Sequence, residues 1–495
     1  MPENLIEKLP EVFVSTTEIS QVVSRAARRG DLRKIGSKLY TKNLTDGPEQ
    51  IVKRNVWQLV AAYVPGALIA DRTAIENVPA PDGSVFVIAD RKRDIKLPGI
   101  TIKPRKGHPP LEDDRPFIGG LFLSSMPRAF LENMMPSRAR SNDVSRTLNR
   151  KEMENQLDLV LRRGGPAALN TLRERARAIA GVLDQQENFE KLDRLIGALL
   201  GTRTDRLVTP AGRARRSGAP YDPDRLQLFD TLHAELRSWP PTERPIPERT
   251  AEARATLAFF EAYFSNFIEG TEFAVSEAAD IVFRGVIPRE RPEDAHDVLG
   301  TWRLVSDPGE MQRLPADAEQ LVRLLGNRHA TIMAGRPDKR PGEFKTEANR
   351  AGQTLFVAPE LVRGTLIQGY DYYRSLESAF ARAVFMMFLV SEVHPFSDGN
   401  GRLARMMMNA ELVAGGQERI LIPTVYRNNY LAALKALSLN KRAEALIRAL
   451  DFAQTWTAAV PWTALEETTT VLDTCNAFAE PGYADNVGLR LTLPQ

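Results

Sequence analysis

The residues best suited to chemistry lie together in one segment, His394-Pro-Phe-Ser-Asp-Gly-Asn-Gly-Arg-Leu-Ala-Arg405. Turn-forming residues from Ser397 to Gly401 stand between two apolar stretches, which predicts a helix, a tight polar turn and a second helix. The first turn of the second helix leaves backbone N–H groups without intrahelical partners, and two glycines let that backbone approach a ligand closely. Because the positive end of the helix dipole lies there as well, the turn is suited to bind phosphate.

Four side chains extend this predicted phosphate site. Arg402 and Arg405 are three residues apart on one helix face, so both can reach phosphate oxygens. Asp398 supplies one carboxylate, and magnesium on a nucleotide is held by one or two carboxylates with phosphates and water. His394 stands at the edge of the turn, where an imidazole can accept a proton from an attacking hydroxyl. The alternative, an ordinary Asp-Gly-Asn-Gly turn with a chance histidine, fits the turn better than it fits the whole segment.

The whole segment resembles the signature of the Fic family, His-Pro-Phe-x-Asp/Glu-Gly-Asn-Gly-Arg-x-x-Arg, and matches it at nine positions. The resemblance covers about residues 280–440. It implies transfer of AMP from ATP to a Ser, Thr or Tyr hydroxyl of a target protein, with pyrophosphate leaving. In that family the histidine is the general base, the acidic residue holds Mg²⁺, and the turn with its arginines holds the phosphates. Here these residues are His394, Asp398, Gly399, Asn400, Gly401, Arg402 and Arg405.

The resemblance extends to a flap that lies before the signature. Fic proteins dock the target segment by strand addition to a β-hairpin flap, and the extended segment 342–359 resembles it. Two positions depart from the family pattern: Lys345 stands where Arg is frequent, and His329 follows Arg328 where a Leu-His pair is common. Phe396 is expected to anchor the loop in the core.

A second motif, Ser265-Asn-Phe-Ile-Glu269-Gly270, ends a predicted helix over 251–268. A carboxylate in the last turn of a helix is disfavoured by the dipole, by about 0.3–1 kcal/mol, so Glu269 is poorly placed for stability. The motif resembles the inhibitory helix of many Fic proteins, Ser/Thr-x-x-x-Glu-Gly/Asn. That resemblance implies an autoinhibitory role in which Glu269 pairs with Arg405 and prevents productive ATP binding. A helix that ends in Glu-Gly by chance is the alternative.

The N-terminal region is locally basic. From Ser24 to Lys42 seven basic residues face one acid, in a pattern that predicts a helix-turn-helix followed by a small β-wing. The pattern resembles the winged helix of AbiEi-type antitoxin regulators, which implies contacts with duplex DNA. A solvated basic helix used for protein contacts is the alternative. The candidate DNA contacts are Arg25, Arg28, Arg29, Arg33, Lys34 and Lys38.

The elements that must position these sites indicate several domains, since 495 residues correspond to about three or four domains. The predicted fold is mainly α: a Fic helical core with a β-hairpin flap, preceded by a winged helix and a small α/β domain. The predicted boundaries are a winged helix at 1–45, an α/β domain at 46–132, a helical region and linker at 133–247, an inhibitory helix at 248–279, a Fic domain at 280–460 and a C-terminal tail at 461–495.

The composition, 43% hydrophobic and 26% charged with a net charge of +3, is typical of a globular protein in water. The longest apolar run, 383–390, is too short to cross a bilayer, and the N-terminus lacks the pattern of a secretory signal. The single cysteine, Cys475, excludes a disulfide framework within one chain. A cytoplasmic protein without a membrane partner is therefore expected, although the composition also suits a secreted effector. A homo-oligomer is left open.

Three hypotheses for the function follow. The first is an autoinhibited AMP transferase with a DNA-binding or target-selecting module. The second is a DNA-binding, antitoxin-like transcriptional regulator whose Fic core only senses nucleotide. The third is a Fic core with other transferase or AMP-removing chemistry. The intact His394 argues against a purely sensory core, because a sensor needs the phosphate site but not the base.

Overall fold

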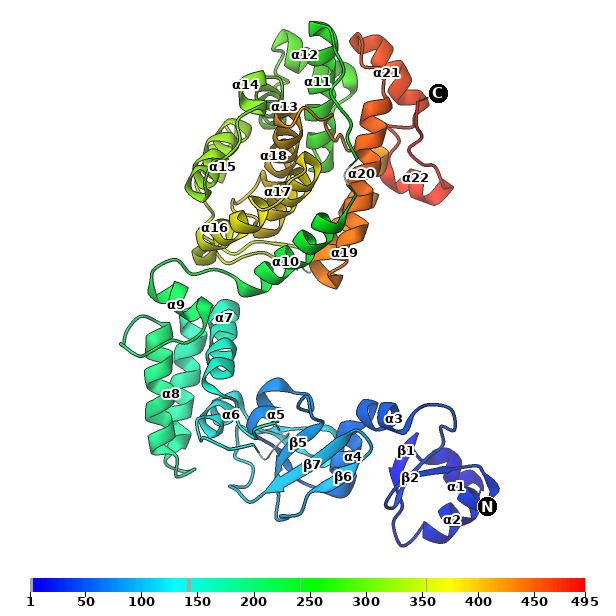
Figure 1. Ribbon diagram of the computed structural model, residues 1–495, viewed down its shortest axis with the longest axis vertical. Helices are drawn as coiled ribbons and strands as arrows, with labels where there is room; N and C mark the ends of the chain where they lie inside the picture. The colour runs from blue at the N-terminus through cyan, green and yellow to red at the C-terminus, as the bar shows by residue number, and fades with distance from the viewer. Residues whose placement is uncertain (1–2, 140–143, 241, 353, 495) are drawn as a thin grey trace. The chain divides into compact units, whose positions relative to one another are not determined.

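The computed structural model describes residues 3–139, 144–240, 242–352 and 354–494 (Figure 1). The chain forms two compact units, residues 1–216 and residues 217–495. Within the described ranges, no helix combines the length and the apolar character needed to cross a bilayer.

The first unit carries strands in its N-terminal part and helices after them. Its strands are β1 (Val12–Val14), β2 (Arg33–Gly36), β3 (Leu39–Thr41), β4 (Leu68–Ile69), β5 (Ser84–Ile88), β6 (Ile95–Leu97), β7 (Ile100–Arg105), β8 (Arg115–Pro116) and β9 (Phe122–Leu123). Its helices are α1 (Glu3–Lys8), α2 (Ser20–Arg29), α3 (Pro48–Arg54), α4 (Val56–Tyr63), α5 (Asp71–Glu76), the 3₁₀ turn Ile118–Gly120, α6 (Met126–Asn133), α7 (Arg150–Ala180), α8 (Gln186–Leu199) and α9 (Pro210–Arg216).

Two sheets organise the strands of the first unit. The first is antiparallel, in the order β1-β3-β2, and packs with α2 through Val23 and Ala26. The second has six strands in the order β6-β7-β5-β4-β9-β8, with β5 parallel to β7 and β4 parallel to β9. The predicted mixed α/β region before a helical core is therefore confirmed. The narrower assignment of residues 1–45 to a winged helix stays a prediction.

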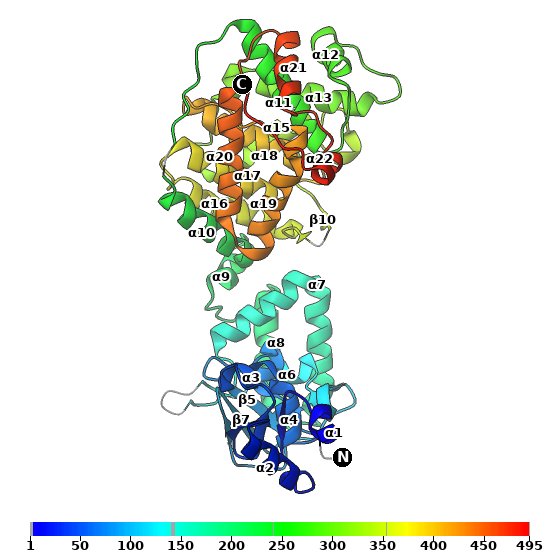
Figure 2. The ribbon, with the colours of Figure 1, turned by 90° about the vertical axis from the view of Figure 1, so that its right-hand side faces the viewer.

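Helix α7 bends sharply (Figure 2). Gly165 interrupts it with a φ of 67° and a ψ of −175°, and Pro166 begins its second half. A proline has no backbone N–H and a fixed φ, so it suits the first position of a helix and ends the half before it. The short helix α9 follows α8 along the chain, within the range 133–247 that was predicted as a helical region and linker.

The second unit is almost entirely helical. Its helices are α10 (Pro223–Ser238), α11 (Ala251–Ile268), α12 (Val275–Arg284), α13 (Pro292–Val305), α14 (Pro308–Met311), α15 (Ala318–Ile332), α16 (Val362–Tyr373), α17 (Ala379–Val393), α18 (Asn400–Ala414), α19 (Arg427–Asn440), α20 (Ala443–Ala459), α21 (Leu465–Thr474) and α22 (Pro481–Val487). It also holds β10 (Arg350–Ala351), β11 (Thr354–Leu355) and the 3₁₀ turns Pro337–Lys339, Pro359–Leu361 and Thr424–Tyr426.

Helices α17 and α18 form the centre of the second unit, surrounded by the other helices (Figure 1). Residues 383–390 of α17 are all apolar and buried, because neighbouring helices surround this part of α17. Phe385 and Phe388 are among the fully buried side chains. α10 packs on α16 and α17, so the region predicted as 133–247 is divided between the two units. The predicted C-terminal tail holds α21 and α22, and Leu472 and Ala484 from these helices join a core cluster with α11.

His329, on α15, ties the segment between α17 and α18 to the rest of the second unit. Its Nε2 lies 3.0 Å from the Asp398 carbonyl oxygen, and its Nδ1 accepts a hydrogen bond from the Gly342 N–H at 2.9 Å. The ring stacks on Phe396 with centroids 3.7 Å apart. Burial lowers the pKa of His329 to about 4, so the ring is neutral at pH 7 and both nitrogens have a partner.

We expect acid to weaken the second unit through His329. Its folded pKa lies below the unfolded value of about 6.5, so its contribution to the free energy of unfolding is complete above pH 6.5. That contribution falls by about 1.4 kcal/mol per pH unit from there toward pH 4. His329→Phe retains the stack but leaves the Gly342 N–H and the Asp398 carbonyl unpaired, which should cost about 1–3 kcal/mol at pH 7.

Urea unfolding followed by tryptophan fluorescence tests this expectation, since four of the five tryptophans lie in the second unit. His329→Phe should show a shallower loss of stability between pH 6.5 and 4.5 than the wild type. The exposed His296 is the matched control, and His296→Phe should leave the pH dependence unchanged. An unaltered pH dependence in His329→Phe would contradict the assignment.

Candidate active site

The loop between α17 and α18 has the shape that the sequence predicted. His394 ends α17 in the left-handed conformation with a φ of 53°, and Gly399 precedes α18 with a φ of 73°. A Cβ on Gly399 would lie 2.6 Å from the Met333 sulfur, so glycine is required for space as well as for conformation. Asn400 is 1% exposed and bonds the Phe396 backbone N–H and carbonyl, each at 2.9 Å. In this arrangement Asn400 holds the loop in shape.

The His394 ring lies between a backbone carbonyl and a phenylalanine ring. Burial lowers its pKa to about 4, so the imidazole is neutral at physiological pH. Its Nδ1 lies 3.3 Å from the Ser391 carbonyl oxygen. A proton on Nδ1 donates to that carbonyl and leaves the Nε2 lone pair to accept another. The Phe356 ring stacks on the imidazole with centroids 3.7 Å apart and planes 6° from parallel.

The N-terminus of α18 already holds an anion, and that anion is the Glu269 carboxylate. A Cβ on Gly401 would lie 2.1 Å from the Glu269 Oε1, so the carboxylate fills the space that this glycine leaves open. The same oxygen accepts a hydrogen bond from the Arg405 Nη2 at 2.7 Å. Glu269 therefore occupies both the glycine-lined space and the arginine that the sequence assigned to phosphate.

Ser265 completes the surroundings of Arg405. The Arg405 Nε donates to the Ser265 Oγ at 3.0 Å, and its Nη2 donates to the Ser265 carbonyl at 2.8 Å. Arg405 is 4% exposed, so solvent screens these contacts little. Gly270, with a φ of 92°, follows the end of α11. The structure thus brings Ser265 and Glu269 of the predicted inhibitory motif onto one guanidinium.

Arg402, which the sequence assigned to phosphate, pairs with a buried carboxylate. Its Nη1 lies 2.5 Å from the Asp297 Oδ2, and both side chains are buried. The same nitrogen lies 3.4 Å from the Asn266 Oδ1. In this conformation Arg402 links α18 to α13 and α11 within the core.

Asp398 is the accessible carboxylate of the loop, with a side chain that is 43% exposed. Its Oδ1 accepts a hydrogen bond from the Gly399 N–H at 2.6 Å. Among the described residues no three His, Cys, Asp or Glu side chains form a metal-binding cluster. A Mg²⁺ ion at Asp398 would therefore take its other ligands from phosphates and water, as nucleotide-bound magnesium commonly does.

The predicted flap contains the antiparallel pair β10–β11, and residue 353 lies outside the described residues. Its base is bonded to the loop: the Lys345 N–H donates to the Pro395 carbonyl at 2.9 Å, and the Asn349 Nδ2 donates to the Phe396 carbonyl at 3.0 Å. The Lys345 Nζ donates to the Asn349 Oδ1 at 2.7 Å. Burial lowers the pKa of Lys345 to about 7.

A cavity of 210 Å³ joins these groups. His394, Gly401, Arg405 and Glu269 line it from one side, and Phe356 contributes from the flap. α19 lines it further with Tyr430, Leu431, Leu434, Lys435 and Ser438. Pockets for drug-sized ligands measure about 300–1,000 Å³, so this cavity is small for ATP while the Glu269 carboxylate is inside it.

The candidate DNA contacts lie in the first unit, on α2 and on the β2–β3 hairpin. Arg25, Arg28, Lys34 and Lys38 are exposed. Arg29 is also exposed, and it pairs with Asp31 at 2.8 Å. Arg33 is half-buried and donates to the Asp46 carbonyl, so it stabilises the hairpin region.

Several residues of this site were not found from the sequence. Asp297 gives a faint signal, because it stands on the buried face of its helix with Val298, Leu304 and Val305. Asn349 and Phe356 give none, because their roles depend on how the flap folds back over the loop.

Residues 320–412 match the family model described as Fic/DOC family. Protein adenylyltransferase fic-1 of Caenorhabditis briggsae is 27% identical over 195 residues, which are 37% of each chain. A Fido domain-containing protein of Dictyostelium discoideum is 38% identical over 80 residues, 15% of this chain and 56% of that one. The chain thus spans less than two thirds of these relatives.

Among solved structures, Fic-1 (residues 134–508) from C. elegans is 18% identical, with 67% of this chain and 96% of that chain covered. Its TM-score of 0.35 is too low to support any comparison of the two folds as wholes. The family match falls on the segment that carries His394, the loop and Arg405. The chain therefore contains a Fic/DOC (Fido) domain related to that of the protein adenylyltransferases named Fic.

Proposed function

We propose that the second unit is an autoinhibited protein adenylyltransferase that moves AMP from ATP to a Ser, Thr or Tyr hydroxyl of a target protein. The observation that carries this proposal is the Glu269–Arg405 pair at the N-terminus of α18, beside a neutral histidine. An anion site of this kind suits phosphate, and the neutral ring suits proton removal. The relatives that are named adenylyltransferases agree with this chemistry.

In the proposed reaction the target hydroxyl oxygen attacks the α-phosphorus of ATP. The bond from that phosphorus to the bridging oxygen of the β-phosphate breaks, and pyrophosphate leaves. The hydroxyl proton passes to the His394 Nε2, because a proton on Nδ1 is held by the Ser391 carbonyl. Mg²⁺ held by Asp398 and the phosphates would neutralise charge that develops on the leaving group.

Autoinhibition follows from competition for one guanidinium. Arginine offers a planar fork that pairs with either a carboxylate or a phosphate. While Glu269 holds Arg405, the γ-phosphate lacks its partner, and ATP binds with its α-phosphate misplaced. A small misplacement of the reacting atoms can reduce the rate about 10²-fold. Inhibition therefore does not require that ATP binding be abolished.

The flap suits an extended segment of the target. Arg350 and Ala351 of β10 are exposed, so this strand can pair with a segment added at its edge. Phe356 covers one face of the His394 ring, so it would border the target side chain as it approaches. The Lys345 and Asn349 bonds would hold this arrangement in register with the loop.

His394→Ala should reduce transfer by about 10²–10⁴-fold and leave ATP binding nearly unchanged, because the imidazole serves the hydroxyl and not the phosphates. Transfer is measured with ATP labelled at the α- or the γ-phosphate in the Glu269→Gly background. Label from the α-position should become protein-bound. Label from the γ-position would show phosphate transfer instead, and near-normal transfer by the alanine variant would exclude His394 as the base.

Glu269→Gly should raise the initial rate of transfer by about 10²-fold because it frees Arg405. Arg405→Ala should abolish activity even in the Glu269→Gly background, because it deletes the shared partner. Glu272, an exposed acid three residues further on, is the matched control, and Glu272→Gly should not activate. Equal rates of self-modification by folded wild type and Glu269→Gly would rule out autoinhibition by Glu269.

We also propose that the first unit binds duplex DNA. Residues 1–216 carry 37 Lys and Arg against 26 Asp and Glu, a net charge of +11, whereas residues 217–495 carry a net charge of −8. α2 buries Val23 and Ala26 and exposes Arg25 and Arg28. An exposed basic helix beside a β-hairpin can contact phosphates along a groove.

Full-length protein should shift a DNA duplex in a gel at low salt, with affinity that falls steeply as salt rises. The double variant Arg25→Glu/Arg28→Glu should weaken the shift at least about tenfold. Arg175→Glu/Arg177→Glu, on α7 of the same unit, changes the charge equally and should weaken it much less. Equal weakening by both pairs, or no shift of any duplex, would favour a surface for protein contacts.

A further inference from the structure

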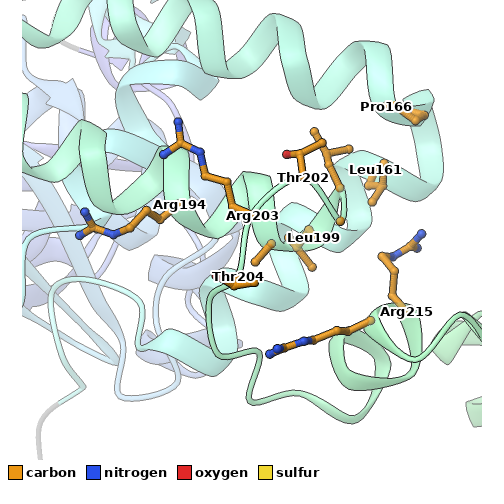
Figure 3. Close-up of a pocket in the computed structure, with 12 residues that line it drawn as sticks. Leu161, Pro166, Arg194, Leu199, Thr202, Arg203, Thr204 and Arg215 are labelled. Carbon is orange, nitrogen blue, oxygen red and sulfur yellow. The ribbon is translucent and has the colours of Figure 1, made fainter.

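A second cavity lies in the first unit and is unrelated to the Fic site (Figure 3). It measures 760 Å³ and is lined by residues from the bend of α7, the end of α8, the loop 200–204 and α9. Its size falls within the range of about 300–1,000 Å³ that is usual for ligand pockets. We call it the arginine pocket, after Arg194, Arg203, Arg215 and Arg216, which line it.

The arginines approach the pocket from two elements. Arg194 and Arg203 come from α8 and the loop after it, and Arg215 comes from α9; Leu199 and Thr202 lie between them (Figure 3). A guanidinium presents five N–H donors in a planar fork that matches phosphate oxygens. Donors that line one cavity from two sides suit a ligand with several anionic oxygens.

The four arginines of the pocket outnumber the carboxylates that pair with them. Asp193 lies 2.7 Å from the Arg203 Nη2 and is shared with Arg173 at 3.8 Å. Asp158 lies 3.1 Å from the Arg215 Nη2 and is shared with Arg162 at 2.9 Å. Within the described residues no carboxylate lies within ion-pair distance of Arg194 or Arg216, so two of the four lining charges have no acidic partner. A surplus of this kind around a concavity attracts an anion.

The bend of α7 adds to the positive electrostatic potential around the pocket. Pro166 lines the pocket and begins the second half of α7, which runs to Ala180. The first turn of a helix carries backbone N–H groups without intrahelical acceptors and the positive end of the dipole. The bend that Gly165 introduces thus places the first residue of a helical segment at the wall of a cavity that arginines also line.

The pocket also has an apolar part. Leu161, Ala198 and Leu199 contribute to its walls together with the Pro166 ring. A site for an inorganic anion alone would need only donors, whereas apolar walls beside donors suit an organic body that carries the anionic group. The unit as a whole has a net charge of +11, which favours the encounter with such a ligand.

We propose that the arginine pocket binds a phosphorylated small molecule of nucleotide size. Its phosphates lie on Arg203, Arg215 and Arg216, and its organic body lies against Leu161 and Leu199. A nucleic acid would use the same charges, but a strand needs a groove that tracks its backbone, whereas these arginines surround a single concavity. The proposal concerns the first unit and does not depend on the reaction proposed for the second.

Isothermal titration of the full chain with inorganic triphosphate tests the anionic part. One saturable site is expected, and Arg203→Gln and Arg216→Gln should each weaken binding at least about tenfold, because each removes a charge-assisted contact. Both side chains are exposed, so the variants should fold. Arg177→Gln is the matched control: Arg177 lies on α7, pairs with Glu174 and does not line the pocket, so affinity should change less than twofold.

Further arms separate the alternatives. Arg405→Ala should leave triphosphate binding unchanged. Loss of binding would place the ion in the second unit, which would refute the proposal for the arginine pocket but not the proposed AMP transfer. In the Arg405→Ala background a nucleoside triphosphate should bind at least as tightly as the inorganic ion, and weaker binding would exclude the organic body. Equal loss in Arg177→Gln, or binding of a DNA duplex through Arg203 and Arg216 without binding of triphosphate, would also refute the proposal.

Discussion

The second unit is organised around a buried guanidinium that must have an anionic partner. Arg405 is 4% exposed, and a charge removed from water is costly unless it is paired. Glu269 supplies that partner, and Ser265 satisfies further N–H groups. The space beside Gly401 and the N-terminus of α18 accept the same carboxylate. Any other anion at this place must displace Glu269, which is why one ion pair links the stability of α11 to access to the site.

His329 and His394 have similar surroundings but different hydrogen-bond partners. Both lie against a phenylalanine at 3.7 Å, and burial lowers the pKa of both to about 4. His329 has a partner on each nitrogen, so it holds the loop and the start of the flap. The described contacts of His394 include a hydrogen-bond partner for Nδ1, the Ser391 carbonyl, and none for Nε2. The two rings therefore differ in how they are bonded: His329 links two segments, whereas His394 keeps the nitrogen that the proposed reaction requires.

The two units differ in charge as well as in fold. The first has a net charge of +11 and the second a net charge of −8, although the whole chain is nearly neutral. The positive charge of the first unit is concentrated in places, on α2 and around the bend of α7. This distribution agrees with the anionic ligands proposed for the first unit, independent of the site proposed for the second.

The sequence by itself determined the elements whose signals are local. The helix 251–268 and the turn between α17 and α18 depend on periodicity and on glycine, and they were predicted within a few residues. The Glu269–Arg405 pair was predicted from a family resemblance, and the structure contains this ion pair. Only the tertiary structure decided the bonding partners of Arg402 and Asn400. Arg402 pairs with Asp297, which lies on another helix. Asn400 accepts a hydrogen bond from the Phe396 backbone because the loop bends back on itself. The arginine pocket also needed the fold, because its residues are spread over 161–216 and meet only where Gly165 bends α7.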